Sequence, residues 1–457
     1  MSVHNKFAMR RHLLCFTQDL RLSDQRLLQA ACKDADELLA VYIWPDQTTT
    51  RWGFPRLGAQ REKFIWLQLH DLAQQLRQCG NDLLVLRGNP PEVLRALLHD
   101  YAIDAIFIEA QYASEEQAMQ QQIASLGVPL HTLWQSGMYD HHYWQDLPKP
   151  KAGPCLIFTE FRRHIEAAGW KADTPLDAPS LLPPVPALAT PLQSQSYHWP
   201  AASWPYAELR RVQSSADAWE FSRSDEFFCD RATATQRIAD YFSAAHGHHY
   251  KQTRDQLFGA FSSSRWSPWL AQGVFSARQL LAQVRQAEQQ MGANSSTYWL
   301  WFELLWRDYF RYVQAQLGAR LFYRAGWREP RDVAQRPFDA AVFARWCHGQ
   351  TGLDLVDAGM RELNHTGFCS NRMRQILASY WLNELQGDWR AGAAWFEAQL
   401  IDYDVYSNYG NWLYLAGLGT DPRGGRHFNI ERQISQFDPE RRYRDYWLRS
   451  ELTRPTN

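Results

Sequence analysis

The sequence predicts two domains of different class, an N-terminal α/β domain with a parallel sheet and a C-terminal all-α domain. Short β-rich apolar runs alternate with amphipathic helical patterns over residues 1–140. From residue 226 to residue 457 the apolar spacing stays helical, and a proline-rich segment separates the two parts. Alternation of strand and helix indicates a parallel sheet covered by helices, whereas an uninterrupted helical period indicates a helical bundle.

Five apolar runs of strand length occur in the first domain. They are LLCF (13–16), LLAVYIW (38–44), DLLVL (82–86), AIFI (105–108) and PLHTLW (129–134). Amphipathic stretches such as REKFIWLQLHDLAQQLRQCG separate these runs, which favours a Rossmann-like order of strands and helices. Such sheets bind ligands at the carboxyl ends of their strands. The sequence has no GxGxxG or P-loop pattern, so the usual dinucleotide fingerprint is missing.

Residues 141–225 are predicted to connect the domains, because residues 174–205 hold eight prolines and no regular period. Beyond this connector, five segments carry apolar residues at i, i+3 and i+4. They are residues 232–244, 276–290, 297–316, 371–386 and 389–401. The predicted helical domain therefore covers residues 226–457.

The composition excludes several classes of protein. Hydrophobic residues make up 45% and the net charge is −1, which is typical of a globular chain rather than a disordered or polyanion-binding one. The seven cysteines include no CxxC pair, which indicates a reduced compartment. Only three of them lie beyond residue 220, too few for a four-thiolate iron–sulfur cluster. No segment reaches membrane-spanning length, and we expect a cytoplasmic monomer without a metal site.

Several predicted helices carry polar groups that a pure core would not contain. Glu303, Trp306 and Arg307 share one helical face, where they could grip a planar, anionic ligand or simply form an ion pair beside a core ring. The segment NRMRQ (371–375) has a similar polar face, which an exposed helix would also show. The segment SSSRWSP (262–268) places four hydroxyls before a helix start, where they could hold a phosphate or only cap the helix.

Long motifs in the same order resemble the DNA photolyase/cryptochrome family. They are FTQDLRLSD (16–24), YKQTRDQLFGAFSSSRWSPWLAQGVFSAR (250–278), WFELLWRDYF (301–310), TGLDLVDAGMRELNHTGFCSNRMRQ (351–375), the stretch from Asp388 to Gln433 that contains SNYGNW, and DPERRYRDYW (438–447). The resemblance covers essentially the whole chain. It implies an N-terminal antenna domain and a helical domain that buries a U-shaped FAD.

The resemblance also assigns residues to the FAD. Those expected at its phosphates are Tyr250, Ser263, Ser264 and Ser267, and Arg265 beside them is also expected to bind the cofactor. Those expected around its isoalloxazine and adenine parts are Arg307, Asn371, Arg374, Asp402, Asp404 and Asn408. Asn408 can offer its amide oxygen to flavin N5–H, and Arg374 with Asp402 can form a buried ion pair beside the ring.

Trp412 and Trp389 match the first two members of the family's electron-transfer chain of tryptophans. The third position departs from the family because it holds Arg336. The outer donor must then be another ring, for which Trp327 and Trp381 are the candidates.

On the substrate side, Glu303 matches the carboxylate that binds a flipped pyrimidine dimer, and Trp306 matches the ring that stacks on it. Arg254 and Arg372 match residues beside the lesion's phosphates. Tyr414 and Gln375 stand where other photolyases have tryptophan and methionine, and both changes resemble the DASH cryptochromes. The residues in this set that would contact DNA are Arg254, Glu303, Trp306, Arg372, Gln375 and Tyr414. Less apolar area for the extruded bases predicts poor repair of duplex lesions.

The resemblance therefore implies blue or near-UV light-driven repair of cyclobutane pyrimidine dimers, preferentially in single-stranded DNA, by a carbon–carbon lyase that uses reduced FAD. Glu116, with Glu115 beside it, aligns with the glutamate that holds a methenyltetrahydrofolate antenna, although two acids at a helix start also favour the helix dipole. The alternative is a flavin photoreceptor whose changed surface is read by a protein or RNA. Glu303 and Trp306 favour repair, because signalling needs no grip on a lesion.

Overall fold

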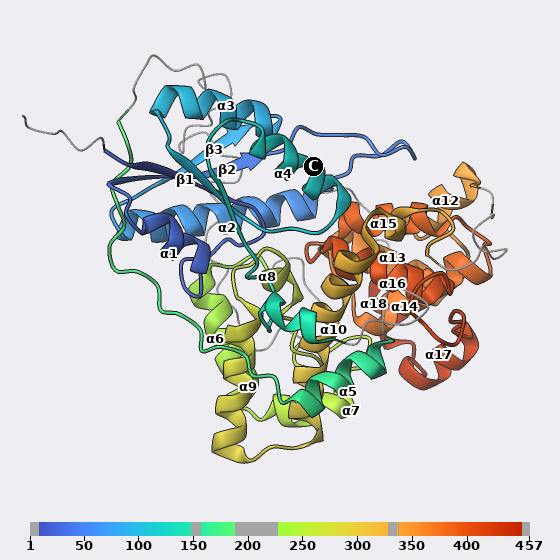
Figure 1. Ribbon diagram of the computed structural model, residues 1–457. Coiled ribbons are helices and arrows are strands. Elements are labelled where there is room, and N and C mark those ends of the chain that lie inside the picture. Colours follow the sequence, from blue (N-terminus) through green and yellow to red (C-terminus); the bar gives the residue numbers. More distant parts are fainter. Residues whose placement is uncertain (1–8, 148–156, 188–226, 328–335, 337, 450–457) are drawn as a thin grey trace, which may run out of the picture.

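The computed structural model describes residues 9–147, 157–187, 227–327, 336 and 338–449. It consists of a five-stranded sheet with helices on both faces and a larger, all-helical part beside it (Figure 1). The predicted fold class, an α/β domain followed by an all-α domain, is confirmed.

All five predicted strands are present, and every pairing between them is parallel. The strands lie in the order β3-β2-β1-β4-β5. Their bounds are β1 Arg11–Phe16, β2 Glu37–Trp44, β3 Leu83–Arg87, β4 Ala105–Glu109 and β5 Leu130–Leu133. In the central strand, Leu13 pairs with Leu39 on one side and Ile106 on the other. Both faces are covered, which explains why the strand sequences are continuous apolar runs.

Two helices cover each face of the sheet. The helices α1 (Arg26–Cys32) and α2 (Ala59–Gln78) pack against one face, in a cluster that includes Leu14 and Tyr42. The helices α3 (Pro90–Tyr101) and α4 (Ser114–Ala124) pack against the other. This layering leaves the carboxyl edge of the sheet to face the helical domain, where Met138 N–H, after β5, donates to Asp308 Oδ2 at 2.9 Å.

The helical domain contains all five helices predicted beyond residue 226. The bounds of its elements are α6 Arg231–Ser243, η5 His246–His249, α7 Tyr250–Thr253, α8 Ser267–Ala271, α9 Ala277–Met291, α10 Ser295–Leu317, η6 Gly318–Phe322, α12 Ala340–Cys347, α13 Asp354–Thr366, α14 Asn371–Asn383, α15 Trp389–Gln399, α16 Val405–Ala416, α17 Ile430–Phe437 and α18 Arg442–Trp447. Side-chain caps begin several of them. Ser370 accepts from Met373 N–H at the start of α14, and Asp404 accepts from Ser407 N–H at the start of α16. Within the described ranges, no helix is long and apolar enough to cross a membrane.

Part of the predicted connector contributes to the packing of both domains. It contains η1 (His141–Asp146) and α5 (Phe158–Ala168), and α5 packs against α10. The proline-rich residues up to 187 run along the α/β domain, where Leu182 N–H donates to Cys79 O at 2.8 Å and Leu38 N–H donates to Pro184 O at 2.9 Å. The rest of that segment, from residue 188, lies outside the described residues.

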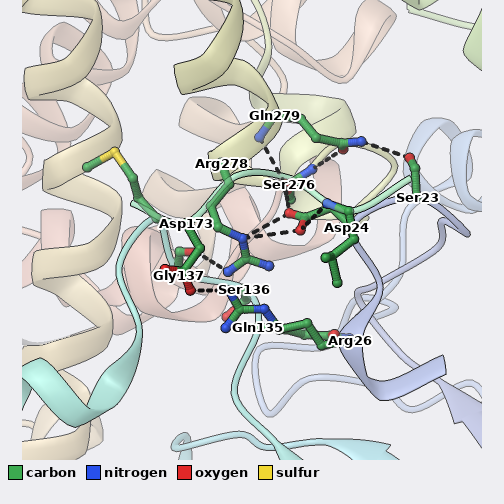
Figure 2. Close-up of polar contacts among 12 residues, drawn as sticks. Ser23, Asp24, Arg26, Gln135, Ser136, Gly137, Asp173, Ser276, Arg278 and Gln279 are labelled. Carbon is green, nitrogen blue, oxygen red and sulfur yellow. Dashed lines mark hydrogen bonds and ion pairs between the residues drawn. The ribbon is translucent and has the colours of Figure 1, made fainter. Parts of the chain in front are cut away.

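A buried polar cluster joins the two domains (Figure 2). Arg278, near the start of α9, donates its Nε–H to Asp24 Oδ2 at 3.0 Å, and the hydroxyl of Ser276 donates to the same oxygen. Asp24 is completely buried and Arg278 is 3% exposed. Gln279 extends the cluster by donating to the Ser23 hydroxyl at 2.7 Å. Because each buried charge has an opposite charge beside it, this cluster holds the domains in one relative position.

Candidate functional site

Two cavities share a wall in the helical domain. The larger cavity has a volume of about 540 Å³ and the smaller cavity about 260 Å³. The residues that line both are Arg254, Glu303, Trp306, Phe310, Asn371, Arg374, Asp402, Ser407 and Asn411. They come from α10, α14, α16 and the loops before α8 and α16, so segments that lie far apart in the sequence build one site.

The smaller cavity is rich in hydroxyl groups and cations. The four residues expected at the FAD phosphates, Tyr250, Ser263, Ser264 and Ser267, line it together with the predicted cofactor residue Arg265. The loop of Ser262, Ser263 and Ser264, called here the serine loop, is fixed at its first residue, because Thr253 Oγ1–H donates to Ser262 O at 2.6 Å. Arg265 has a left-handed backbone (φ +50°), which turns the chain sharply before α8. Hydroxyls, guanidinium groups and a helix start together suit a phosphate ligand.

Arg307 also lines the smaller cavity, but its guanidinium is bonded to backbone carbonyls rather than left free for a ligand. It donates to Ser136 O and, at 3.3 Å, to Leu270 O. Burial, with the neighbouring charge of Arg311, lowers the pKa of Arg307 to about 10. Arg307 therefore braces the wall between the domains as well as bordering the cavity.

Arg374 and Asp402 form a two-fold ion pair at the shared wall. The guanidinium donates to Oδ1 at 3.0 Å and to Oδ2 at 2.8 Å, and its Nε–H donates to Cys369 O at 3.0 Å. Burial disfavours the charge on Arg374, but Asp402 outweighs that effect and raises the arginine pKa. The pair therefore keeps a fixed positive group at the cavity wall, as expected beside an anionic ring.

Asn408 lines the larger cavity from the first turn of α16. Its amide N–H donates to Ala393 O on α15 at 3.0 Å, which leaves the amide oxygen as the acceptor for a ligand. Asp404 begins the same helix and pairs with Arg311. Although burial opposes the carboxylate, Arg311, Arg307 and the Ser407 N–H hold the pKa of Asp404 below its usual value. The first turn of α16 is thus fixed by the ion pair of Asp404 with Arg311 and by the hydrogen bond of Asn408 to Ala393 O.

Glu303 faces both cavities and is paired with Arg254 from α7's C-terminal end. Burial raises the pKa of Glu303, and Arg254 acts in the opposite direction. Arg254 also lies over the Trp299 ring, 4.7 Å from its centroid. The predicted lesion carboxylate is therefore positioned by a cation and an aromatic ring.

Trp306 lies in an aromatic cluster at the shared wall. Phe158 of α5 stacks on it with centroids 3.6 Å apart and an interplanar angle of 7°, and Tyr414 meets it edge-on at 5.7 Å. Gln375 and Tyr414 both line the larger cavity. Arg372 lies outside the residues that line either cavity and pairs with Asp255 at 2.9 Å. Of the six residues predicted to contact DNA, five thus line the larger cavity.

Other aromatic and cationic residues line the larger cavity that sequence reasoning missed. They are Trp299, Phe302, Phe310, Phe396, Phe428, Arg423 and Arg426. Four rings of α10, at positions 299, 302, 306 and 310, recur every three or four residues. That spacing signals one helical face, but a core face gives the same signal. The sequence alone therefore could not tell a cavity-lining face of α10 from a face buried in the core.

The predicted indole relay begins at the larger cavity and leads into α15. Trp412 lines that cavity and packs against Gly392, where a Cβ would fall 2.3 Å from Cη2 of the indole. Trp389 lies three residues before Gly392, on the same face of α15. It is fully buried, and its indole N–H donates to Arg324 O at 3.0 Å.

A third cavity, of about 250 Å³, lies between the domains and is called here the interdomain cavity. Glu116 and Glu115 line it from the first turn of α4, opposite Trp52 and Tyr409. Burial, with the charge of Glu115 beside it, raises the pKa of Glu116. Arg56 pairs with Glu115 at 2.7 Å and also with Glu397. The predicted antenna residue thus borders a cavity large enough for a planar ligand.

Among the residues that the structure describes, no group of three or more His, Cys, Asp or Glu side chains is arranged to hold a metal ion.

Comparisons with known proteins match the chain along most of its length. A family model described as DNA photolyase matches residues 12–181, and one described as FAD binding domain of DNA photolyase matches residues 299–455. A protein named Cryptochrome DASH from Gloeobacter violaceus is 39% identical over 444 residues, covering 95% of this chain and 85% of that protein. Cryptochrome DASH from Xenopus laevis is 36% identical, covering 96% and 82%.

Solved structures agree with these matches. The crystal structure of a Synechocystis cryptochrome has a TM-score of 0.83 and 36% identity, covering 96% of this chain and 89% of that one. A class III photolyase from Agrobacterium tumefaciens has a TM-score of 0.76 at 23% identity, which supports the fold alone.

Proposed function

We propose, on the premise that this chain belongs to the DNA photolyase and cryptochrome family, that it is a light-driven lyase for cyclobutane pyrimidine dimers, preferentially in single-stranded DNA. Family membership supports FAD as the cofactor and DNA as the partner. The observation that carries the proposal is that Glu303 and Trp306 line both cavities, so a lesion in the larger one would lie beside a cofactor that extends from the smaller one.

The residues present fit FAD, because their donors and acceptors match its parts. Bound FAD supplies light-driven one-electron chemistry. In this proposal the serine loop and Tyr250 hold its phosphates, while the Arg374–Asp402 pair and Asn408 hold its ring. The amide oxygen of Asn408 would accept a hydrogen bond from a ring N–H of the flavin, because the amide N–H of Asn408 is already bonded to Ala393 O. These groups orient the cofactor and keep its ring out of water.

Glu303 would hold the dimer and Trp306 would support it. The carboxylate can accept N–H donors of the extruded bases when Arg254 turns to the phosphate backbone, where a guanidinium binds well. Trp306 and Tyr414 lie edge to face, and together they form part of the aromatic wall of the larger cavity. The relay of Trp412 and Trp389, behind the ring, would return the cofactor to its reduced state.

The preference for single strands follows from two side chains, Tyr414 and Gln375, that offer the extruded bases less apolar area than tryptophan and methionine would. Extruding bases from a duplex costs a few kcal/mol, and stacking on aromatic rings repays about 1–3 kcal/mol per base. Tyr414 is smaller than tryptophan and its hydroxyl accepts from Arg426 at 3.0 Å, while Gln375 adds a polar amide. Lesions that are already unpaired avoid the cost of opening, so this cavity favours them.

Methenyltetrahydrofolate in the interdomain cavity is part of the proposal. Glu116 at the start of α4 would accept N–H groups of a pterin, and Trp52 would pack against its ring. Arg51 and Arg56 border the same cavity and suit the glutamate tail of a folate.

The test is illumination of the purified FAD-bound protein with dimer-containing oligonucleotides, single-stranded and double-stranded. We expect thymines to be restored in light, faster in the single strand, and not at all in darkness. Repair of neither substrate by a protein with fully bound FAD would overturn the lyase and favour the photoreceptor. Equal repair of both substrates would overturn only the strand preference.

A further inference from the structure

The predicted electron-transfer relay of Trp412 and Trp389 ends on Trp389, which is poorly placed to hold a positive charge. Trp389 is fully buried, and its indole N–H is bonded to a backbone carbonyl, which cannot take up a proton. An indole that has lost an electron there would remain a charged radical away from water, which is unfavourable. Arg336, at the usual next position, has no ring to pass the charge on.

Tyr409 lies next to Trp389, and on α16 it stands three residues before Trp412. The two ring centroids are 6.1 Å apart at an interplanar angle of 84°. Tyr409 is only half-buried, and it lines the interdomain cavity. Its hydroxyl donates to Glu397 Oε2 at 3.3 Å. The phenol therefore combines ring contact with Trp389, a carboxylate base and access to the cavity.

Glu397 can take up a proton without depriving its partner Arg56 of every counter-charge. Its carboxylate pairs with Arg56, and Arg56 pairs independently with Glu115 at 2.7 Å. If Glu397 becomes neutral, Arg56 keeps a counter-charge in Glu115. The Arg56 side chain is 41% exposed, so water screens what charge remains.

We propose that Tyr409 is the terminal electron donor of the relay and that Glu397 is its proton acceptor. This inference rests on the proposed flavin site, because the oxidant is Trp389 after it has lost an electron, by way of Trp412, to light-excited oxidised FAD. One electron passes from the phenol to the Trp389 radical cation, which becomes neutral indole. The Tyr409 O–H bond breaks and the proton moves to Glu397 Oε2. The products are a neutral phenoxyl radical and a carboxylic acid, so charge and atoms balance.

A competing branch leaves Trp412 by another route. Trp346 lies 6.5 Å from Trp412, and Trp381 lies 5.2 Å from Trp346. Both are at most 1% exposed, and the Trp381 N–H donates to a backbone carbonyl, Asp388 O. Neither ring offers a proton to a base, so a charge that reached Trp381 would return. The geometry therefore points to Tyr409 rather than to Trp381, one of the two predicted candidates.

The experiment uses the full chain with oxidised FAD bound, excited by a light flash and followed by time-resolved EPR and absorption. We expect a neutral tyrosyl radical in the wild type, with a spectrum that narrows when tyrosine is ring-deuterated and a formation rate that slows in D₂O. In Tyr409→Phe the tyrosyl signal should vanish, and the yield of long-lived charge separation should fall by about tenfold. Glu397→Gln should slow tyrosyl formation and abolish the D₂O effect. Tyr380→Phe, which removes another half-buried phenol on α14, should change nothing.

The outcomes separate this inference from the function beneath it. A wild-type protein without any tyrosyl signal overturns the inference even if the variants do not fold. Unchanged photoreduction in Tyr409→Phe, together with its loss in Trp389→Phe, overturns Tyr409 and leaves the relay intact. Loss in Trp381→Phe alone would replace Tyr409 with the Trp346 branch. Unchanged photoreduction in Trp389→Phe and Trp412→Phe would overturn both this inference and the proposed relay.

Discussion

Arg254 and Glu303 form an ion pair at the wall shared by the two cavities, with Trp299 stacked against the guanidinium. The carboxylate proposed to hold the lesion is thus already bound to a cation. A dimer must exchange with that cation, which links binding of the extruded bases to release of Arg254 toward the phosphates.

This exchange predicts different effects for two changes at Glu303. Glu303→Ala removes the acceptor and leaves Arg254 without its partner, and we expect repair to fall by about 100-fold, or roughly 2.7 kcal/mol. Glu303→Gln keeps one acceptor oxygen, so the loss should be about tenfold. Repair rates under saturating light measure both effects, and the flavin absorbance of each variant must stay unchanged. Equal activity of Glu303→Ala and the wild type would remove Glu303 from the lesion site.

The Arg374–Asp402 pair should be needed for stability as well as for the cofactor. In Asp402→Asn the Arg374 guanidinium loses its counter-charge in a buried place, which costs about 3 kcal/mol of unfolding free energy. FAD content should fall with it, and urea unfolding with the absorbance ratio of flavin to protein measures both. Asp354→Asn is the matched control, because its ion pair with Arg441 is exposed at both ends and its loss should change stability little. A fully loaded, fully stable Asp402→Asn variant would contradict the prediction.

Enlarging the apolar side of the larger cavity should improve work on duplex DNA. Tyr414→Trp adds stacking area near Trp306, and we expect tighter binding of a duplex lesion by about 1 kcal/mol, or about fivefold. Tyr414→Phe is the control, since it removes only the hydroxyl that Arg426 binds. Binding titrations with matched single and double strands test this. If Tyr414→Trp changes both substrates by the same factor, the explanation of strand preference by stacking area is wrong.

Glu109, at the end of β4, should make stability depend on pH. Burial first, and then Asp19, raise its pKa to about 8. The carboxyl is therefore neutral in the folded state up to about pH 8, whereas in the unfolded chain it ionises above its ordinary value of 4.5. Its contribution to stability is complete below pH 4.5 and is lost as the pH rises toward 8, by up to roughly 5 kcal/mol.

Glu109→Gln removes this titration and nearly preserves the shape of the side chain. The variant should match the wild type near pH 5 and exceed it in unfolding free energy near pH 8. Urea titrations at both pH values supply the measurement. A difference between the two proteins that does not change with pH would mean that Glu109 keeps an ordinary pKa in the fold.

Glu116→Gln should test the antenna without touching the flavin. We expect the folate content after reconstitution to fall by about tenfold, because a carboxylate accepts N–H groups roughly twice as strongly as an amide. FAD content and the repair rate under direct flavin excitation should not change. Full folate content in Glu116→Gln would indicate that the two acids at the start of α4 act only on the helix dipole.

The strands and the main helices were predictable because their signals are local. A strand buried on both faces, such as β2, must be apolar throughout, and the helices must repeat apolar residues with the period of the helix. Most predicted site residues line the cavities for a related reason: Glu303, Trp306 and Arg307 lie on one side of one helix, so their neighbourhood followed from spacing.

Contacts between segments that lie far apart in the chain could not be predicted from the sequence. Phe158 covers Trp306 from a connector whose composition suggested only a spacer. Arg372, expected at the lesion phosphates, pairs with Asp255 and lies over the Phe437 ring, and neither partner was predictable from the sequence. Its neighbour Arg374 differs by two positions, about 200° around the helix, and reaches the cavity. Pairings of this kind depend on how helices pack, which spacing along one chain does not encode.

The buried cluster of Asp24 with Arg278 and Ser276 limits how this architecture can be recombined. A chimaera that takes its sheet domain from a different protein would bury Arg278 without a counter-charge unless the donor supplies an acid in the position of Asp24. Exchange of sheet domains between members of this family should therefore succeed only when both sides of this contact are transferred together.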